Sequence, residues 1–153
     1  MFFFGNDFGM QKGLLFSEEM WMEFFYESYR RIVEQAHRHG LVVMTHSCGN
    51  IAPLIRHLID AGVDILDPVQ TTAAGMDPSR LKPAFGDEIV FHGAVDTQQI
   101  LPRCTPDEVG RHVREMVEVI GRDGGYIVAP CNNLQDDTPV ENVVALYRAA
   151  GGG

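Results

Sequence analysis

Three residues of the types that bind soft metal ions follow two apolar runs of this sequence. His46 and Cys48, separated by one residue, come after the run Leu41–Met44, and Cys131 comes after Tyr126–Ala129. In an extended segment alternate residues point to the same side, so the imidazole and thiol of the first pair can bind the same metal ion. Zinc binds histidine nitrogen and cysteine sulfur, and a catalytic zinc site keeps one position open. From the residues alone, a buried histidine with two unreactive core cysteines is the alternative.

The apolar runs that carry these residues belong to a set of five, which alternate with longer amphipathic segments. The runs are Phe2–Phe4, Leu41–Met44, Val63–Leu66, Ile89–Phe91 and Tyr126–Ala129. They are short, continuous and rich in β-branched or aromatic residues, which is typical of strands covered on both faces. Their alternation with helical segments predicts βα units and a parallel sheet. We expect one α/β domain over residues 1–150 and a flexible glycine tail over residues 151–153.

Several sequence signals mark where the helices between these runs begin. Ser17 precedes two acidic residues, and Thr105–Glu108 forms a capping box with proline at the first helical position. The same device recurs at Thr138–Glu141. A further helix is expected from Asn50, and its positive N-terminal end would favour the thiolate form of Cys48 just before it.

Polar or reactive residues follow each of the five predicted strands. They are Asn6 and Asp7, His46 and Cys48, Asp67 and Gln70, His92 and Asp96, and Cys131 with Asn132 and Asn133. Parallel α/β folds place their active sites at this carboxyl edge of the sheet. The sequence contains no glycine-rich phosphate loop, which argues against a nucleotide-binding fold.

The length of the chain limits which parallel fold it can form. A complete (β/α)₈ barrel takes about 250 residues, and 153 residues supply five βα units. We therefore expect a partial barrel with open sheet edges, which are sites of association. Either the chain is the C-terminal part of a longer protein, or it pairs with itself or with another chain.

Composition excludes several classes of function. The net charge is −9, from 12 basic and 21 acidic residues, which opposes binding to nucleic acid. Three widely spaced cysteines make no disulfide framework, which suits a reducing compartment. The apolar start turns polar too early for a signal peptide, and no run approaches the roughly 20 residues of a membrane span. We expect a soluble cytoplasmic protein without membrane or nucleic-acid partners.

The order of the motifs resembles the uroporphyrinogen decarboxylase superfamily. The resemblance is carried by the stretches His46–Asn50, Leu54–Gln70, Ala74–Pro78 and Phe91–Gln98, with Asn6–Gln11 and Gly124–Pro130 in the same pattern. It covers nearly the whole chain, in order and without large gaps. It implies a (β/α)₈ TIM barrel, of which this chain would be roughly the C-terminal half.

The superfamily contains cobalamin-linked methyltransferases and true decarboxylases of tetrapyrrole side chains. Resemblance to the methyltransferases implies zinc held by His46, Cys48 and Cys131, a substrate thiol, and a methyl donor such as methylcobalamin on a corrinoid protein. The alternative is a tetrapyrrole decarboxylase of porphyrin biosynthesis, a branch that lacks this ligand pair and uses Arg and Asp residues of the N-terminal half. A non-catalytic fragment, or a half-barrel that completes another chain, is the third possibility.

Two positions depart from the family pattern. Relatives often have histidine where Asn132 stands, and the methyltransferase cysteine falls near that position, so the register of Cys131 stays open. Asn6 stands where relatives commonly have aspartate.

The remaining candidate site residues come from the other strand ends. Asp7, His92 and Asp96 are candidates for catalysis, by substrate orientation or proton transfer, and Gln11, Gln70 and Gln98 for hydrogen bonds to a polar substrate. The alternative for each is a purely structural role, such as capping a helix or tying two loops together.

Overall fold

The structure, a computed structural model that describes residues 1–151, is built on a five-stranded parallel sheet. The strands are β1 (Phe2–Gly5), β2 (Val43–His46), β3 (Ile65–Val69), β4 (Val90–Val95) and β5 (Tyr126–Pro130). Each overlaps one of the five predicted runs. They pair in chain order, β1-β2-β3-β4-β5. A doubly wound sheet would reverse its strand order, so this topology is that of a partial (β/α) barrel and confirms the predicted fold class.

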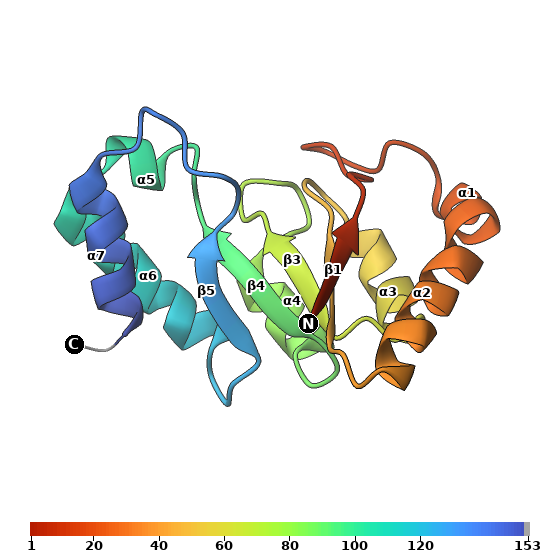
Figure 1. Cartoon of the computed structure of the whole chain (residues 1–153). Coiled ribbons are helices and arrows are strands. Elements are labelled where there is room, and N and C mark those ends of the chain that lie inside the picture. Colours follow the sequence, from red (N-terminus) through yellow and green to blue (C-terminus); the bar gives the residue numbers. More distant parts are fainter. Residues whose placement is uncertain (152–153) are drawn as a thin grey trace.

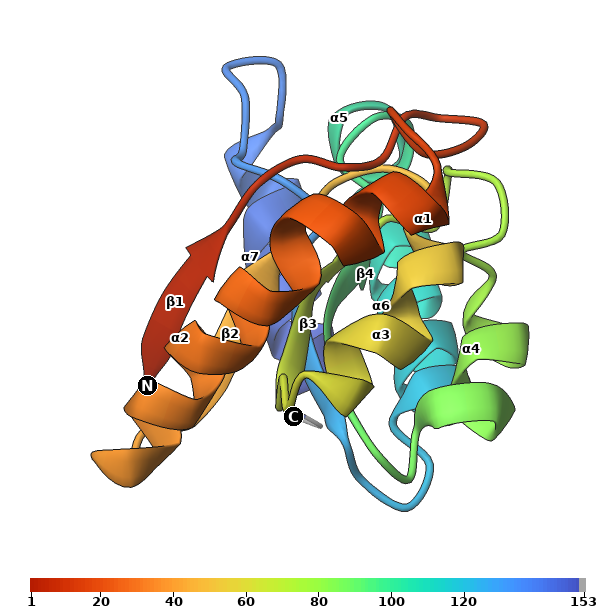
Figure 2. The ribbon, with the colours of Figure 1, turned by 90° about the vertical axis from the view of Figure 1, so that its right-hand side faces the viewer.

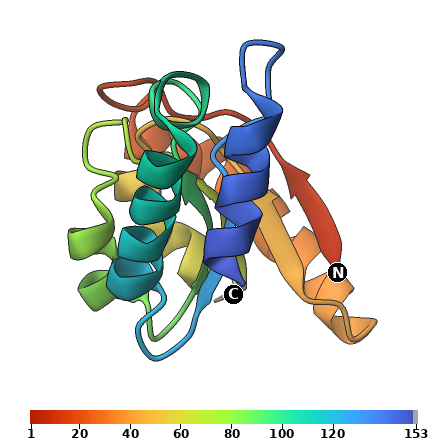
Figure 3. The same cartoon turned by 90° about the vertical axis from the view of Figure 1, so that its left-hand side faces the viewer.

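The connections between strands are helical. The helices are α1 (Glu18–Trp21), the π-helical turn η1 (Met22–Tyr26), α2 (Glu27–Arg38), the 3₁₀ turn η2 (Ala52–Leu54), α3 (Ile55–Asp60), α4 (Pro78–Phe85), α5 (Ile100–Arg103), α6 (Pro106–Ile120) and α7 (Val140–Ala150). They lie along one face of the sheet, as Figures 1 and 2 show together. At the β5 end α6 and α7 pack side by side (Figure 3). The arrowheads of β1 and β5 point to the same edge, where the loops of the candidate site lie (Figure 1).

The core lies between the sheet and these helices, in two hydrophobic clusters. The larger includes the buried side chains of Trp21, Leu66, Met76 and Phe91. The smaller consists of Val95, Leu101, Val109, Val113 and Leu146, between the end of β4 and the helices α5 to α7. Burying these side chains fixes one face of the sheet against the helices. No helix of residues 1–151 covers the opposite face, which is turned to the viewer in Figure 1.

Two of the predicted helix starts are confirmed. The hydroxyl of Ser17 accepts a hydrogen bond from the backbone N–H of Met20 at the start of α1. At the start of α6, Thr105 and Glu108 exchange both hydrogen bonds of a capping box. These caps satisfy backbone donors that the first turn of a helix leaves free.

The other two predicted starts are wrong. The residue before α7 is Pro139, in extended conformation, and no side chain caps this helix, so Thr138 is not its N-cap. Helical backbone also begins only at Ala52, as a 3₁₀ turn, and α3 from Ile55 has six residues. Cys48 therefore does not stand directly before an α-helix. Its environment is set instead by the loops described below.

The predicted glycine tail over residues 151–153 lies, beyond Gly151, outside the described residues; Gly151 itself is the C-terminal cap of α7. Within residues 1–151, none of the helices combines the length and the apolar character that crossing a membrane requires.

Candidate metal centre

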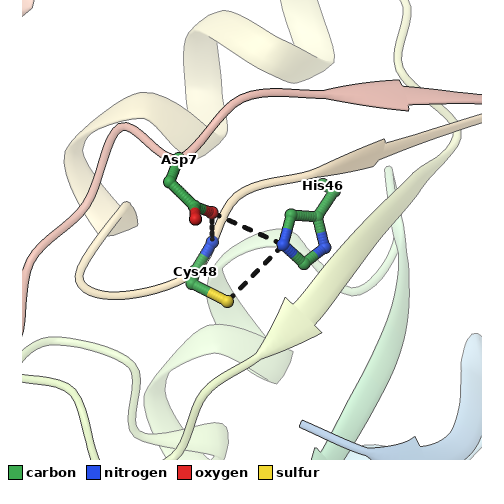
Figure 4. A group of neighbouring side chains, drawn as sticks. All are labelled: Asp7, His46 and Cys48. Atoms are coloured by element: carbon green, nitrogen blue, oxygen red, sulfur yellow. Dashed lines mark hydrogen bonds and ion pairs between the residues drawn. The ribbon is translucent and has the colours of Figure 1, made fainter. Parts of the chain in front are cut away.

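Three possible metal donors from two neighbouring strand ends lie together at the carboxyl edge of the sheet. His46 is the last residue of β2, Cys48 follows in the next loop, and Asp7 follows β1 (Figure 4). The His46 Nε2 atom is 3.5 Å from Cys48 Sγ and 3.4 Å from Asp7 Oδ1. The three donor atoms all lie within 4.8 Å of one another. The predicted pair His46 and Cys48 does point to one side, and the carboxylate of Asp7 joins it.

Close contact between the first two strand ends produces this grouping. β1 and β2 pair with Gly5 beside His46. A Cβ atom on Gly5 would lie 2.2 Å from the backbone oxygen of His46, so only glycine fits at this point. Further along, the backbone N–H of Cys48 donates to Asp7 Oδ1 at 2.8 Å. The carboxylate that faces the imidazole thus also fixes the backbone that carries the thiol.

A second loop contact shapes the turn after Cys48. Gly49 has φ +83°, in the left-handed region that favours glycine. Its backbone N–H donates to Gln70 Oε1 at 2.8 Å, and the Gln70 side chain is buried. Gln70, predicted to bind substrate, therefore has its side-chain oxygen engaged in holding the loop that carries the candidate ligand.

On its other side, the imidazole of His46 is held by a carboxylate of the third strand. Asp67 Oδ2 accepts from His46 Nδ1 at 2.6 Å, and Asp67 Oδ1 accepts from His92 Nδ1 at 2.6 Å. The hydrogen bond with Asp67, followed by that with Cys48, raises the pKa of His46 to about 10. Burial would raise the pKa of Asp67, but hydrogen bonds from His46 and His92 outweigh it and lower that pKa to about 2. Asp67 is therefore ionised, and a metal at Nε2 would displace a proton from His46.

The chemistry of the three donors fits a zinc ion. Bonds of about 2.0–2.3 Å in a tetrahedral site separate ligand atoms by roughly 3.3–3.8 Å. The observed separations of 3.4 and 3.5 Å around Nε2 fall in this range. Zinc-bound histidine commonly donates its other ring N–H to a carboxylate, which is the role that Asp67 plays for His46 here. Three protein donors leave one position open, as in a catalytic site.

Cys131 does not join this group. Its side chain is 4% exposed, and its thiol donates to the backbone oxygen of Val69 at 3.1 Å. Burial, the largest cause, raises the pKa of this thiol to about 12. The next residue, Asn132, lies over the site instead, with its Nδ2 atom donating to Cys48 Sγ at 3.6 Å. In this structure the side chain at position 132, rather than that at position 131, therefore contacts Cys48, and Asp7 lies beside His46 and Cys48 where Cys131 was expected.

Asp96 also lies apart from the three donors and has a structural contact set. Its buried carboxylate accepts backbone N–H groups of Gln98, Gln99 and Ile100 at 2.7, 3.0 and 3.3 Å. These bonds hold the turn that leads into α5, which is a structural role and the alternative to the predicted catalytic one.

The two remaining predicted glutamines are exposed at the surface of the same edge. For Gln11 and Gln98, the contacts within residues 1–151 are made by the backbone: Gln11 accepts from Ala74 N–H, and Gln98 accepts from the guanidinium of Arg103. The structure thus brings neither side chain to the candidate ligands.

A cavity of about 560 Å³ opens beside the candidate ligands on the uncovered face of the sheet. Its lining consists of Phe3, Gly5, Met44, His46, Asp67, His92, Ala129, Pro130, Cys131, Asn132 and Asn133. The walls are mainly apolar, and polar groups gather at the end that holds His46. Of the three candidate donors, His46 is the one that lines this cavity, so a small molecule held there would lie next to its imidazole.

Comparison with known proteins agrees with this arrangement of strands. The model of the uroporphyrinogen decarboxylase (URO-D) family matches residues 7–152. The chain belongs to the URO-D family. The family predicted from the motifs is thereby confirmed.

Relatives of this URO-D family chain include a methyltransferase. The chain is 25% identical over 137 residues to a methylated-thiol–coenzyme M methyltransferase of Methanosarcina mazei, covering 88% of this chain and 34% of that protein. A solved methyltransferase from Methanosarcina mazei superposes with a TM-score of 0.76 at 22% identity, over 99% of this chain and 42% of that one. The solved structure shows the shared fold. The chain thus spans between a third and a half of the length of these relatives.

Two residues of this URO-D site were not singled out from the sequence as site residues. Asp67 links two imidazoles, and Asn132 contacts the thiol of Cys48. The parallel register that pairs His46 with Asp67 could have indicated the first, once β2 and β3 were assumed to be neighbours. Departure from the family pattern at Asn132 was the available signal for the second.

Proposed function

We propose that this chain is the zinc-binding part of a methyltransferase that moves a methyl group from a corrinoid to a substrate thiol. The observation that carries the proposal is the group Asp7, His46 and Cys48, with the Nδ1 atom of His46 held by Asp67. When bound there, zinc would take up a thiol in its open position and favour the thiolate at neutral pH. This reaction requires two partners: the substrate thiol, and a corrinoid that is carried by a separate protein.

The chain's own residues have distinct tasks in this reaction. His46, Cys48 and Asp7 hold the metal. His92 and Asn132 line the cavity beside it and orient the substrate by hydrogen bonds. Apolar walls exclude water from the reacting sulfur, which strengthens electrostatic effects there.

The length of the two related methyltransferases indicates how many βα units methyl transfer needs. Since the chain spans 34% and 42% of the two methyltransferases, we propose that the activity needs the remaining βα units of a complete barrel. Those units would close the uncovered face of the sheet over the cavity. Three free cysteines, one of them a candidate ligand, suit the reducing cytoplasm as the site of this chemistry.

Decarboxylation of a tetrapyrrole is less well supported. Its substrate carries several carboxylates and needs cationic partners. The described residues that line the cavity include neither lysine nor arginine, whereas Asp67 adds negative charge.

The test is zinc content together with methyl transfer from methylcobalamin to a thiol, measured on the purified full-length protein. We expect about one zinc per chain in the wild type and loss of both zinc and activity in Cys48→Ala. Cys104→Ala is the matched control, since the Cys104 thiol is not among the three candidate donors and donates to the backbone oxygen of Gln99. Metal-free protein with full activity would refute the proposal.

A further inference from the structure

A single buried carboxylate joins two imidazoles from the strands on either side of it. Asp67, on β3, accepts from His46 on β2 through one oxygen and from His92 on β4 through the other, both at 2.6 Å. The side chain of Asp67 is 12% exposed. His92 is not among the three donor residues, yet it shares a hydrogen-bond partner with one of them.

The shared carboxylate determines how the two rings are oriented. Each Asp67 oxygen lies 2.6 Å from one ring nitrogen, so both imidazoles turn Nδ1 towards the carboxylate. For His46 this leaves Nε2 as the atom that faces Cys48 and Asp7. Removing His92 would leave one Asp67 oxygen without a partner in a largely buried place, which is costly and frees the carboxylate to turn.

The backbone at the end of β4 is adapted to bring His92 to this position. Gly93 and Ala94 have φ of +103° and +65°, and Ala94 is fully buried. A Cβ atom on Gly93 would lie 2.9 Å from the Cβ atom of Pro68, the residue after Asp67. A non-glycine residue in the left-handed region is strained, and such strain persists only where the surroundings enforce it. The close approach of β4 to β3 thus places His92 against Asp67.

We propose that His92 is a positioning residue for the candidate metal ligand His46, acting through Asp67. By holding one oxygen of the carboxylate, His92 fixes the other against His46 Nδ1 and so presents Nε2 as the donor atom. This inference rests on the proposed zinc site and concerns a residue that touches none of the three donor atoms. Outer hydrogen bonds of this kind set both the orientation and the basicity of a histidine ligand.

The experiment measures zinc affinity of the full-length protein by competition with a chromophoric chelator. We expect His92→Leu to weaken zinc binding by about 10- to 100-fold. His92→Gln, whose amide N–H can still donate to Asp67, should stay within about threefold of the wild type. His39→Leu, at an exposed imidazole that follows α2, is the matched control and should bind zinc as the wild type does. Thermal unfolding of each variant separates a loss of ligand geometry from a loss of fold.

A second measurement needs no variant. In the zinc-loaded wild type, ¹H–¹⁵N spectra of the imidazoles should show a proton on Nδ1 of both His46 and His92. The inference would be overturned if His92 carried no proton on Nδ1, or if a folded His92→Leu variant bound zinc with wild-type affinity. If the wild type binds zinc through Cys48 while His92→Leu has no effect, this inference fails and the proposed function stands. If the wild type binds no zinc, both fail.

Discussion

The loops that follow two strands of the sheet, β2 and β5, each carry a cysteine, and the two thiols have opposite environments. Cys48, after β2, lies 3.5 Å from an imidazole nitrogen and contacts a second loop through its backbone. Cys131, after β5, is buried against the oxygen of Val69. In an extended segment a shift of one residue sends a side chain to the opposite face. A cysteine after a strand therefore becomes a candidate ligand only where its side chain points to the face that carries the other donors.

The largest expected effect concerns the β2 end. His46→Ala removes the central donor and leaves Asp67 without one of its two partners. We predict that the purified full-length protein falls from about one zinc per chain to almost none. Metal analysis by mass spectrometry checks this. A His46→Ala protein with its full zinc content would place the metal elsewhere.

The second prediction compares the reactivity of the two thiols directly. Because burial raises the pKa of Cys131 to about 12, this residue stays a protonated thiol at any pH well below that value. Thiolate is the nucleophile, so at pH near 8 iodoacetamide should modify Cys48 in zinc-stripped protein at least about 100-fold faster than Cys131. Peptide mapping gives both rates from one sample. Equal modification rates for Cys48 and Cys131 would show that the two thiols do not differ in reactivity.

A third prediction tests whether the β5 end is one residue from ligand register. Asn132→Cys puts a thiol beside Cys48, because the Asn132 amide already lies 3.6 Å from Cys48 Sγ. We expect zinc affinity to rise by roughly tenfold, since zinc favours thiolate ligands. Asn133→Cys, one residue further along and also at the cavity, is the control and should change the affinity little. An unchanged zinc affinity in Asn132→Cys would contradict the inference that position 132 faces the candidate metal ligands.

The smallest effect is expected at Cys131 itself. Cys131→Ala removes a buried sulfur and its hydrogen bond to Val69, which should lower the free energy of unfolding by about 1 to 2 kcal/mol. Zinc content should not change. Denaturant unfolding and metal analysis of the same preparation decide this, because loss of zinc without loss of stability would identify Cys131 as a ligand.

Much of the fold could be predicted from the sequence, because the spacing of apolar residues indicates which faces of a strand or helix are buried. All five apolar runs lie in or overlap strands of one parallel sheet. The capping box at Thr105 is also present, since its signal is local. The similar pattern at Thr138 failed because Pro139, in extended conformation, takes the N-cap position itself. Local signals thus predicted elements well and their ends less well.

The candidate site was predictable only in part, because it depends on how distant segments meet. The pair His46 and Cys48 follows from alternation along one strand. The role of Asp67 depends on three strands in register, and the contact of Asp7 with Cys48 on a loop from another strand. Whether residue 131 or 132 faces the site depends on the path of the chain after β5. A single sequence indicates such contacts only once the order and register of the strands are assumed.

We propose a metal centre with one thiolate, made by Asp7, His46 and Cys48, without Cys131. X-ray absorption at the zinc edge of the substrate-free full-length protein counts its sulfur ligands directly. We expect one sulfur at about 2.3 Å with nitrogen and oxygen neighbours, and an identical spectrum for Cys131→Ala. Two sulfur ligands, of which one disappears in Cys131→Ala, would contradict it.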